Sequence, residues 1–380
     1  MKTPLRLLLA AALAALPLNT HAADAFSNAA PSPQVKVDPR VELLSLIFRL
    51  AGNPEYSQAK VRAYAQDADK QFDGFRNHAV VNLARKLRRN DGVSYDAVMS
   101  LAVHLKDAEG LELAGPLEPW PADLDARWKP ETVKQFLAAA RQFVRAAGFK
   151  QFCEQHRGLY DTTAGRLRAL LEKRAHLEWY QGYFGERPGA TFRTVPGLLN
   201  GGCCYGPRWR EPQGREALYC ILGVWKTDGE GLPEFTPDTL GTLVHEFCHS
   251  FANPIIARHE TELSAAGEKI FRHVAERMRS QAYGTAGTML RESLVRACTV
   301  RFHRQFEGAE AARRAAQSEA SRGFVWTADL ARLLEEYEGQ RGKYPTLDSF
   351  APRVVAFFDE YAREIDKKPT ALGLVIERRP

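Results

Sequence analysis

The chain has 380 residues, of which 45% are hydrophobic and 26% are charged, and its formal net charge at neutral pH is +6. This composition is ordinary for a globular protein, and the length is sufficient for two or three packed subregions. The charge is mild and spread along the chain, without a basic stripe interleaved with aromatic residues, so nucleic acid is not expected as a partner.

Residues 1–22 have the organisation of a secretory signal peptide. Lys2 and Arg6 supply the positive start, an apolar run follows from residue 7 to residue 18, and Thr20-His21-Ala22 is a small-residue cleavage site. The run is short for a membrane span and no other long apolar stretch exists, so stable membrane insertion is not expected after cleavage. We therefore expect a periplasmic or secreted bacterial protein, beginning near Ala23.

The first half of the mature chain is predicted to be helical. After a polar, proline-containing lead at residues 23–37, amphipathic patterns define an N-terminal helical region at 38–175. They predict helices near 41–50, 56–70, 76–90, 94–106, 130–147 and 148–174. Single histidines in this half, namely His78, His104, His156 and His176, are interpreted as packing or surface residues.

A second region, residues 176–310, combines short apolar runs with glycine-rich turns. Strands are predicted at 179–184, 191–199 and 217–225, followed by helices near 258–282 and 286–306. The turn Asn200-Gly-Gly-Cys-Cys-Tyr-Gly-Pro207 indicates unusual backbone or a close approach between chain segments. A C-terminal helical region follows at 311–380, with helices near 325–340 and 346–364. The predicted fold is α+β, predominantly helical, with a small sheet before the central helix.

Six cysteines in an exported protein permit disulfide bonds. We expect Cys203 or Cys204 to pair with Cys220, because both ends of that pairing flank predicted strands. Cys248 is equally consistent with a small buried apolar residue.

The segment His245-Glu246-Phe247-Cys248-His249 has the spacing of a zinc-binding helix. Residues four apart lie on one helix face, so His245 and His249 can bind the same ion while Glu246 reaches its bound water. Thr236 and Pro237 are predicted to start the helix, and Asn253-Pro254 to end it.

A catalytic zinc usually has three protein ligands and one open position, so a third ligand is required. A metzincin would place glycine and histidine at positions occupied here by Ala252 and Ile255, which excludes that class. Glu292, on a predicted buried helix, is the preferred third ligand, as in glutamate-type zincins. The alternatives are other glutamates of the downstream helices: Glu260, Glu262, Glu268 and Glu276.

Several segments resemble a bacterial family catalogued as a domain of unknown function (DUF4932-like). They are VDPRVELLSLIFRLAGNPEYS at 37–57, NGGCCYGP at 200–207, HEFCHSFANP at 245–254 and ESLVRA at 292–297. Members of that family resemble glutamate-type zincin peptidases, so the resemblance implies a zincin-like core with Zn²⁺ as cofactor.

These residues together predict a secreted zinc metallopeptidase acting on a peptide or protein substrate. Glu246 would be the general base, and Tyr283, Tyr205 or Arg296 would donate to the developing oxyanion. An extended peptide could pair with a strand edge near 196–206 or 217–225. A zinc-bearing binding protein without turnover and a non-peptidase zinc hydrolase stay open as alternatives.

Overall fold

The computed structural model describes residues 33–211 and 214–367. The predicted signal peptide and most of the predicted lead lie outside the described residues. The last part of the lead is described, and it is not loop: Gln34–Val35 form strand β1, with Val35 buried. In the described part of the chain, no helix has the length and apolar character that crossing a bilayer requires.

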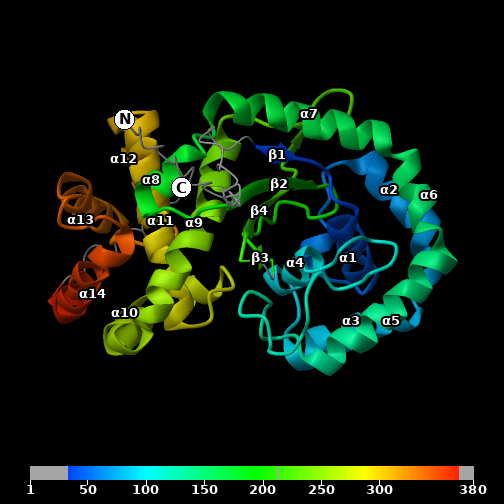
Figure 1. Ribbon diagram of the computed structural model, residues 1–380, viewed down its shortest axis with the longest axis horizontal. Coiled ribbons are helices and arrows are strands. Elements are labelled where there is room, and N and C mark those ends of the chain that lie inside the picture. Colours follow the sequence, from blue (N-terminus) through cyan, green and yellow to red (C-terminus); the bar gives the residue numbers. More distant parts are fainter. Residues whose placement is uncertain (1–32, 212–213, 368–380) are drawn as a thin grey trace, which may run out of the picture.

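A four-stranded sheet occupies the middle of the molecule (Figure 1). Its order is β1-β2-β4-β3, with β1, β2 and β4 parallel and β3 antiparallel to β4. A separate two-stranded antiparallel sheet follows in the chain. The remaining strands are β2 (Thr191–Gly197), β3 (Arg208–Arg210), β4 (Glu216–Gly223), β5 (Lys226–Thr227) and β6 (Pro233–Glu234).

Strand β4 has an almost continuously apolar sequence, and the burial of both of its faces explains this. Ala217, Tyr219 and Ile221 belong to one hydrophobic core, whereas Leu218 and Cys220 belong to a second core. Successive side chains of a strand point to opposite faces, so both faces of this sheet are covered, as is usual for parallel sheets. The sheet therefore separates the two cores of the protein.

The first core is formed by the N-terminal helices, which curve around the right side of Figure 1. Helix α1 is buried along almost its whole length, and Asp38 caps it by accepting the Arg40 amide at 3.0 Å. The helices of this half are α1 (Pro39–Leu50), α2 (Arg62–Phe72), α3 (Ala79–Asp91), α4 (Asp96–Val103), α5 (Pro130–Ala147), α6 (Phe149–Gln155) and α7 (Arg157–Arg174). Helix α7 contributes Tyr160 to the first core, whereas its Ala164, Leu167 and Leu171 belong to the second core.

The second core joins the other face of the sheet to the C-terminal helices, on the left of Figure 1. Helices α9 and α11 pack closely against each other, and α9 also packs on β4. The helices are α8 (Glu178–Phe184), α9 (Asp238–Arg258), α10 (Glu260–Arg279), α11 (Ala286–Phe306), α12 (Ala309–Ser321), α13 (Thr327–Gly339) and α14 (Leu347–Glu364).

Several predicted boundaries are wrong. Residues 179–184 form α8 rather than a strand, because Trp179, Tyr180, Tyr183 and Phe184 make one buried helical stripe. The predicted helix at 148–174 is divided at His156 into α6 and α7. Helix α12 is not predicted as a separate helix, although residues 311–380 are predicted to be a helical region. Its exposed, alanine-rich sequence buries only Ala312 and Ala316, so it lacks a strong apolar periodicity.

The ends of α9 also differ from the prediction. The helix begins at Asp238, with Pro237 at the cap position, and the Thr236 side chain does not cap it. It continues through Pro254 to Arg258. An interior proline removes one backbone hydrogen bond and costs about 3 kcal/mol. Burial of Ile255 and Ile256 beyond it offsets this cost by a similar amount, about 1.5–3 kcal/mol for each side chain.

Candidate metal centre

Helix α9 carries the two histidines on one face, one turn apart. His245 and His249 face α11, and their imidazole rings meet nearly edge to face with centroids 4.7 Å apart. The Nδ1 atom of His249 lies 3.2 Å from Asn253 Oδ1, one further turn along the same face. An outer hydrogen bond of this kind fixes the tautomer and ring orientation of a metal-binding histidine, leaving Nε2 free to coordinate.

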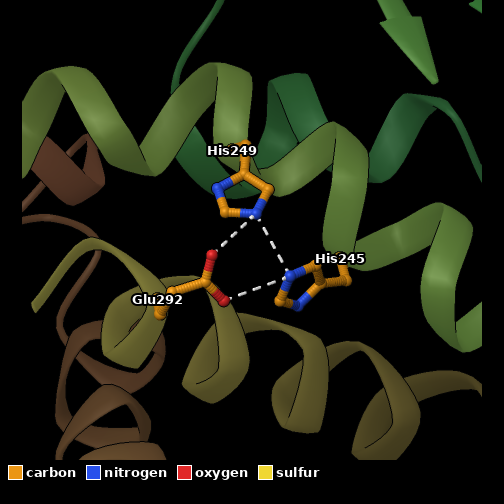
Figure 2. Close-up of side chains that lie close together, drawn as sticks. All are labelled: His245, His249 and Glu292. Atoms are coloured by element: carbon orange, nitrogen blue, oxygen red, sulfur yellow. Dashed lines mark hydrogen bonds and ion pairs between the residues drawn. The ribbon is translucent and has the colours of Figure 1, made fainter. Parts of the chain in front are cut away.

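Helix α11 supplies the carboxylate. Thr285 caps this helix by accepting the Thr288 amide at 3.1 Å, and the residues that follow are buried against α9 and the C-terminal helices. Glu292 lies two turns inside the helix and is 7% exposed. Figure 2 shows its carboxylate directed at both imidazoles from the opposite helix. Two segments almost fifty residues apart in sequence thus converge on one point.

The three side chains have the spacing of a metal-binding set. The Nε2 atoms of His245 and His249 are 3.1 Å apart, and each lies 3.4 Å from one oxygen of Glu292 (Figure 2). Ligand atoms at about 2.0–2.1 Å from a tetrahedral zinc ion would be about 3.3 Å from one another. The residues present therefore fit the ion, with Glu292 in the position of the third ligand.

Burial and neighbouring charges set the protonation of these donors. Burial lowers the pKa of His245 to about 4, so its imidazole is neutral at pH 7. Burial opposes ionisation of Glu292, but His249, His245 and Arg296 together hold the pKa of that carboxyl well below its usual range. A neutral imidazole and an ionised carboxylate are the forms that bind a divalent metal.

Glu246 is adjacent to the cluster without belonging to it. Its carboxylate is almost fully buried and, among the described residues, forms no hydrogen bond. Burial raises its pKa to about 7. The metal-binding group identified in the described residues contains only His245, His249 and Glu292. A buried carboxyl that titrates near neutrality is suited to accept and return a proton.

The glycine-rich turn lies directly against Glu246. A Cβ atom added to Gly206 would stand 2.3 Å from the Glu246 carbonyl oxygen, closer than real contacts allow. Similarly, a Cβ at Gly223 would stand 2.4 Å from the Gly201 carbonyl oxygen. The prediction of a close approach at this turn is confirmed. Glycine is required at position 206 because a side chain would separate the turn from helix α9, and at position 223 because a side chain would separate β4 from the turn.

Arg296 links Glu292 to the C-terminal helices. Its guanidinium donates to Glu292 Oε2 at 2.9 Å and to the Tyr283 hydroxyl at 3.0 Å, and it pairs with Glu319 of α12. The guanidinium also lies 4.3 Å from the centroid of the Phe324 ring. Arg296 and Tyr283, both predicted oxyanion donors, thus lie beside the cluster, where Arg296 is bonded to Glu292 and the Tyr283 hydroxyl is bonded to Arg296.

Other predicted candidates lie elsewhere. Tyr205 packs in the N-terminal core, on the face of the sheet opposite α9, so it is not part of the site. The alternative ligands belong to α10 rather than to the cluster, where Glu260 pairs with Arg291 and Glu262 with His259. The remaining two, Glu268 and Glu276, are likewise on α10.

The disulfide prediction is wrong for this structure, because all six cysteines are unpaired thiols. Cys220 is buried in the C-terminal core, and Cys204 packs against the same core near Glu246. Flanking strands brought these residues towards one region, but strand position does not supply the side-chain geometry that a disulfide needs.

Sequence reasoning missed two residues that support the site. Asn253 was assigned to a helix stop because a proline follows it, although its position four residues after His249 could have indicated a hydrogen-bonding partner. Glu319 had no sequence signal, since α12 itself was not predicted.

The fold and this cluster define an α+β protein, predominantly helical, with a His-His-Glu group between two buried helices. A family model, the domain of unknown function DUF4932, matches residues 34–357. The chain belongs to this family. Searches of curated proteins and of solved structures each find no match.

Proposed function

We propose that this protein is a zinc-dependent metallopeptidase. The observation that carries the proposal is the spacing of the His245, His249 and Glu292 donor atoms, at 3.1–3.4 Å from one another, beside a buried glutamate that is not among them. A purely structural zinc site would be closed by a fourth protein ligand. It would also have no use for Glu246.

In this proposal His245, His249 and Glu292 would hold the zinc ion. When bound, the ion would lower the pKa of water and polarise a carbonyl group. The carboxylate of Glu246 takes a proton from the attacking water and later delivers it to the leaving amine. Its pKa of about 7 is appropriate for both transfers at neutral pH. The Tyr283 hydroxyl, which accepts a hydrogen bond from Arg296 at 3.0 Å, is a candidate donor to the developing oxyanion.

A peptide is favoured over another hydrolysable substrate because an edge of the sheet borders the site. The segment around Gly206 forms that edge and touches the backbone of Glu246. Exposed strand edges bind extended peptides through main-chain hydrogen bonds. The same arrangement would hold a peptide bond next to Glu246. We also propose that the protein is exported and begins near Ala23, on the strength of the signal-like residues 1–22.

The test is a digest of a peptide library by the zinc-loaded mature protein, with and without a chelator, together with a metal assay. Chelator-sensitive cleavage and about one zinc per chain are expected. Stoichiometric zinc without cleavage would instead identify a zinc-bearing binding protein. Hydrolysis of a non-peptide ester or amide with intact peptides would identify a different hydrolase. A protein that binds no zinc would overturn the proposal.

A further inference from the structure

The edge of the sheet beside the metal centre has a defined, short length. Tyr205 exchanges both backbone hydrogen bonds with Ile221 of β4, and Pro207 accepts the Tyr219 amide. In an antiparallel ladder the intervening residues direct their backbone groups away from the partner strand, so Gly206 and Arg208 face outwards.

This open edge ends at Arg210. The Arg210 backbone amide, also directed outwards, donates to Asp123 Oδ2 at 2.6 Å. Asp123 is held in turn by His104, whose Nε2 lies 3.3 Å from the other carboxylate oxygen. A peptide pairing with the edge can therefore use Gly206 and Arg208, but not Arg210.

Arg208 lies along the metal-binding helix rather than away from it. Gly206 touches Glu246, as described above, and marks one point of contact between this edge and α9. Arg187 marks a second point, because it stacks on Phe251 at 4.3 Å and pairs with Glu216 at the start of β4. The segment from Gly206 to Arg210 thus runs in the same direction as α9. Arg208, paired with Leu218, lies between the two points.

The surroundings of Arg208 carry more positive than negative charge. Arg187, Arg208 and Arg210 all lie near the carboxylate of Glu216, and Asp123 adds a second carboxylate at Arg210, so three positive charges face two negative ones. Glu216 pairs with Arg187 at 3.0 Å and with Arg210. The Arg208 side chain forms no hydrogen bond or ion pair within the described residues and is half-buried. Burial lowers the pKa of Arg187, and repulsion from Arg208 and Arg210 acts in the same direction.

An unpaired guanidinium at the end of a peptide-pairing edge is arranged to receive an anion. Its planar fork matches a carboxylate with two parallel hydrogen bonds. Side chains at positions 206 and 208 share the face of the strand that is directed at α9, because they are two residues apart. A substrate group that meets Arg208 would therefore lie on the same side of the sheet as the metal centre.

We infer that Arg208 forms a subsite for a carboxylate of the peptide substrate, so that the enzyme prefers acidic peptides. This inference rests on the proposed function, since it assigns the substrate class of the same site. The carboxylate is either an acidic side chain or the carboxyl terminus of the peptide, and the chemistry of recognition is common to both.

The test uses full-length mature protein loaded with zinc and, for each position tested, four versions of one cleaved peptide. The peptide carries Asp or Asn at each position near the scissile bond in turn, and ends in a free acid or an amide. The expected result is a preference of at least about tenfold in kcat/KM for one acidic version, the size of a charge-assisted hydrogen bond. A loss of preference on changing Asp to Asn would identify an acidic side chain as the bound carboxylate. A loss on changing the free acid to an amide would identify the carboxyl terminus.

Substitutions of Arg208 test whether this residue causes the preference for acidic peptides. Arg208→Gln should abolish the preference, so that acidic and neutral peptides are cleaved with equal kcat/KM, and Arg208→Lys should restore part of it. Arg215→Ala is the matched control, because Arg215 is exposed and pairs with Glu211 on the same hairpin. Circular dichroism confirms that each variant is folded.

A binding measurement separates this inference from the proposed function. The affinity of labelled peptides for Glu246→Gln protein is measured by fluorescence anisotropy. Cleavage without any charge preference overturns the inference alone. Tighter binding of the acidic peptide, lost in Arg208→Gln protein, without cleavage by the wild type, supports the subsite and overturns the peptidase. If the peptides are neither bound nor cleaved, the inference and the proposed function are both overturned.

Discussion

Each side of the central sheet buries a glutamate whose pKa is raised to about 7, but the two residues have different surroundings. Glu42, in the N-terminal core, accepts the Leu198 amide at 2.8 Å and lies among apolar and phenolic side chains. Glu246, in the C-terminal core, forms no hydrogen bond among the described residues and lies beside two imidazoles and a second carboxylate. A raised pKa alone therefore does not identify a catalytic group. What distinguishes Glu246, the proposed general base, is the group of possible metal ligands beside it.

The comparison between Glu42 and Glu246 is tested most strongly by removing the proposed third ligand, Glu292. Glu292→Ala should lower bound zinc and abolish activity together, because two histidines cannot complete the protein's share of a tetrahedral site. Zinc is counted by mass spectrometry after circular dichroism has confirmed the fold. Glu260→Ala, Glu262→Ala, Glu268→Ala and Glu276→Ala serve as controls and should keep nearly stoichiometric zinc. A folded Glu292→Ala protein with full zinc would contradict the ligand assignment.

Exchanging the two buried carboxyls for amides separates their roles. Glu246→Gln should retain zinc and lose about 10²–10⁴-fold in kcat, the usual contribution of a general base. Glu42→Gln should retain both zinc and kcat per folded molecule. Steady-state kinetics on a cleaved peptide measures both variants. Equal rates for Glu246→Gln and wild-type protein would remove Glu246 from the mechanism.

Glu42 should instead appear in the pH dependence of stability. Its pKa is about 7 in the folded protein and about 4.5 when unfolded, so the folded state binds more protons between these values. Its contribution is therefore fully present below pH 4.5 and is lost as the pH rises through 7, by about 3 kcal/mol. Urea unfolding at pH 5 and pH 8 should show that wild-type protein loses this stability relative to Glu42→Gln. If the free energies of unfolding of wild-type and Glu42→Gln protein differed by the same amount at pH 5 and pH 8, a buried, ionising Glu42 would be contradicted.

The smallest expected effect concerns Asn253. Asn253→Ala removes the hydrogen bond to His249 Nδ1 and should weaken zinc binding by about 10- to 100-fold without unfolding the helix. Competition with a chromogenic chelator measures the affinity. Asn253→Asp should bind zinc at least as tightly as the wild type, because a carboxylate also accepts from Nδ1. Unchanged affinity in Asn253→Ala would show that packing alone orients His249.

The sequence predicted those features that depend on local spacing. Two histidines four apart on a helix share a face in any fold, and the glycines of the 200–207 turn signalled a close approach. Glu292 could also be selected, because its apolar neighbours indicated a buried helix. The predicted small sheet before helix α9 and the surrounding helices are present, although 179–184 is predicted as a strand and forms a helix.

Only the tertiary structure decided which distant residues meet. Glu42 and Glu246 are both glutamates in apolar helices, and nothing in their local sequence separates a backbone hydrogen bond from a neighbouring imidazole. The pairing of Arg296 with Glu319, the position of Tyr205 on the far face of the sheet and the unpaired thiols all depend on how elements pack across long separations. Helical and strand periodicities specify the face on which a residue lies, whereas the partner opposite that face is chosen by the packing of the whole chain.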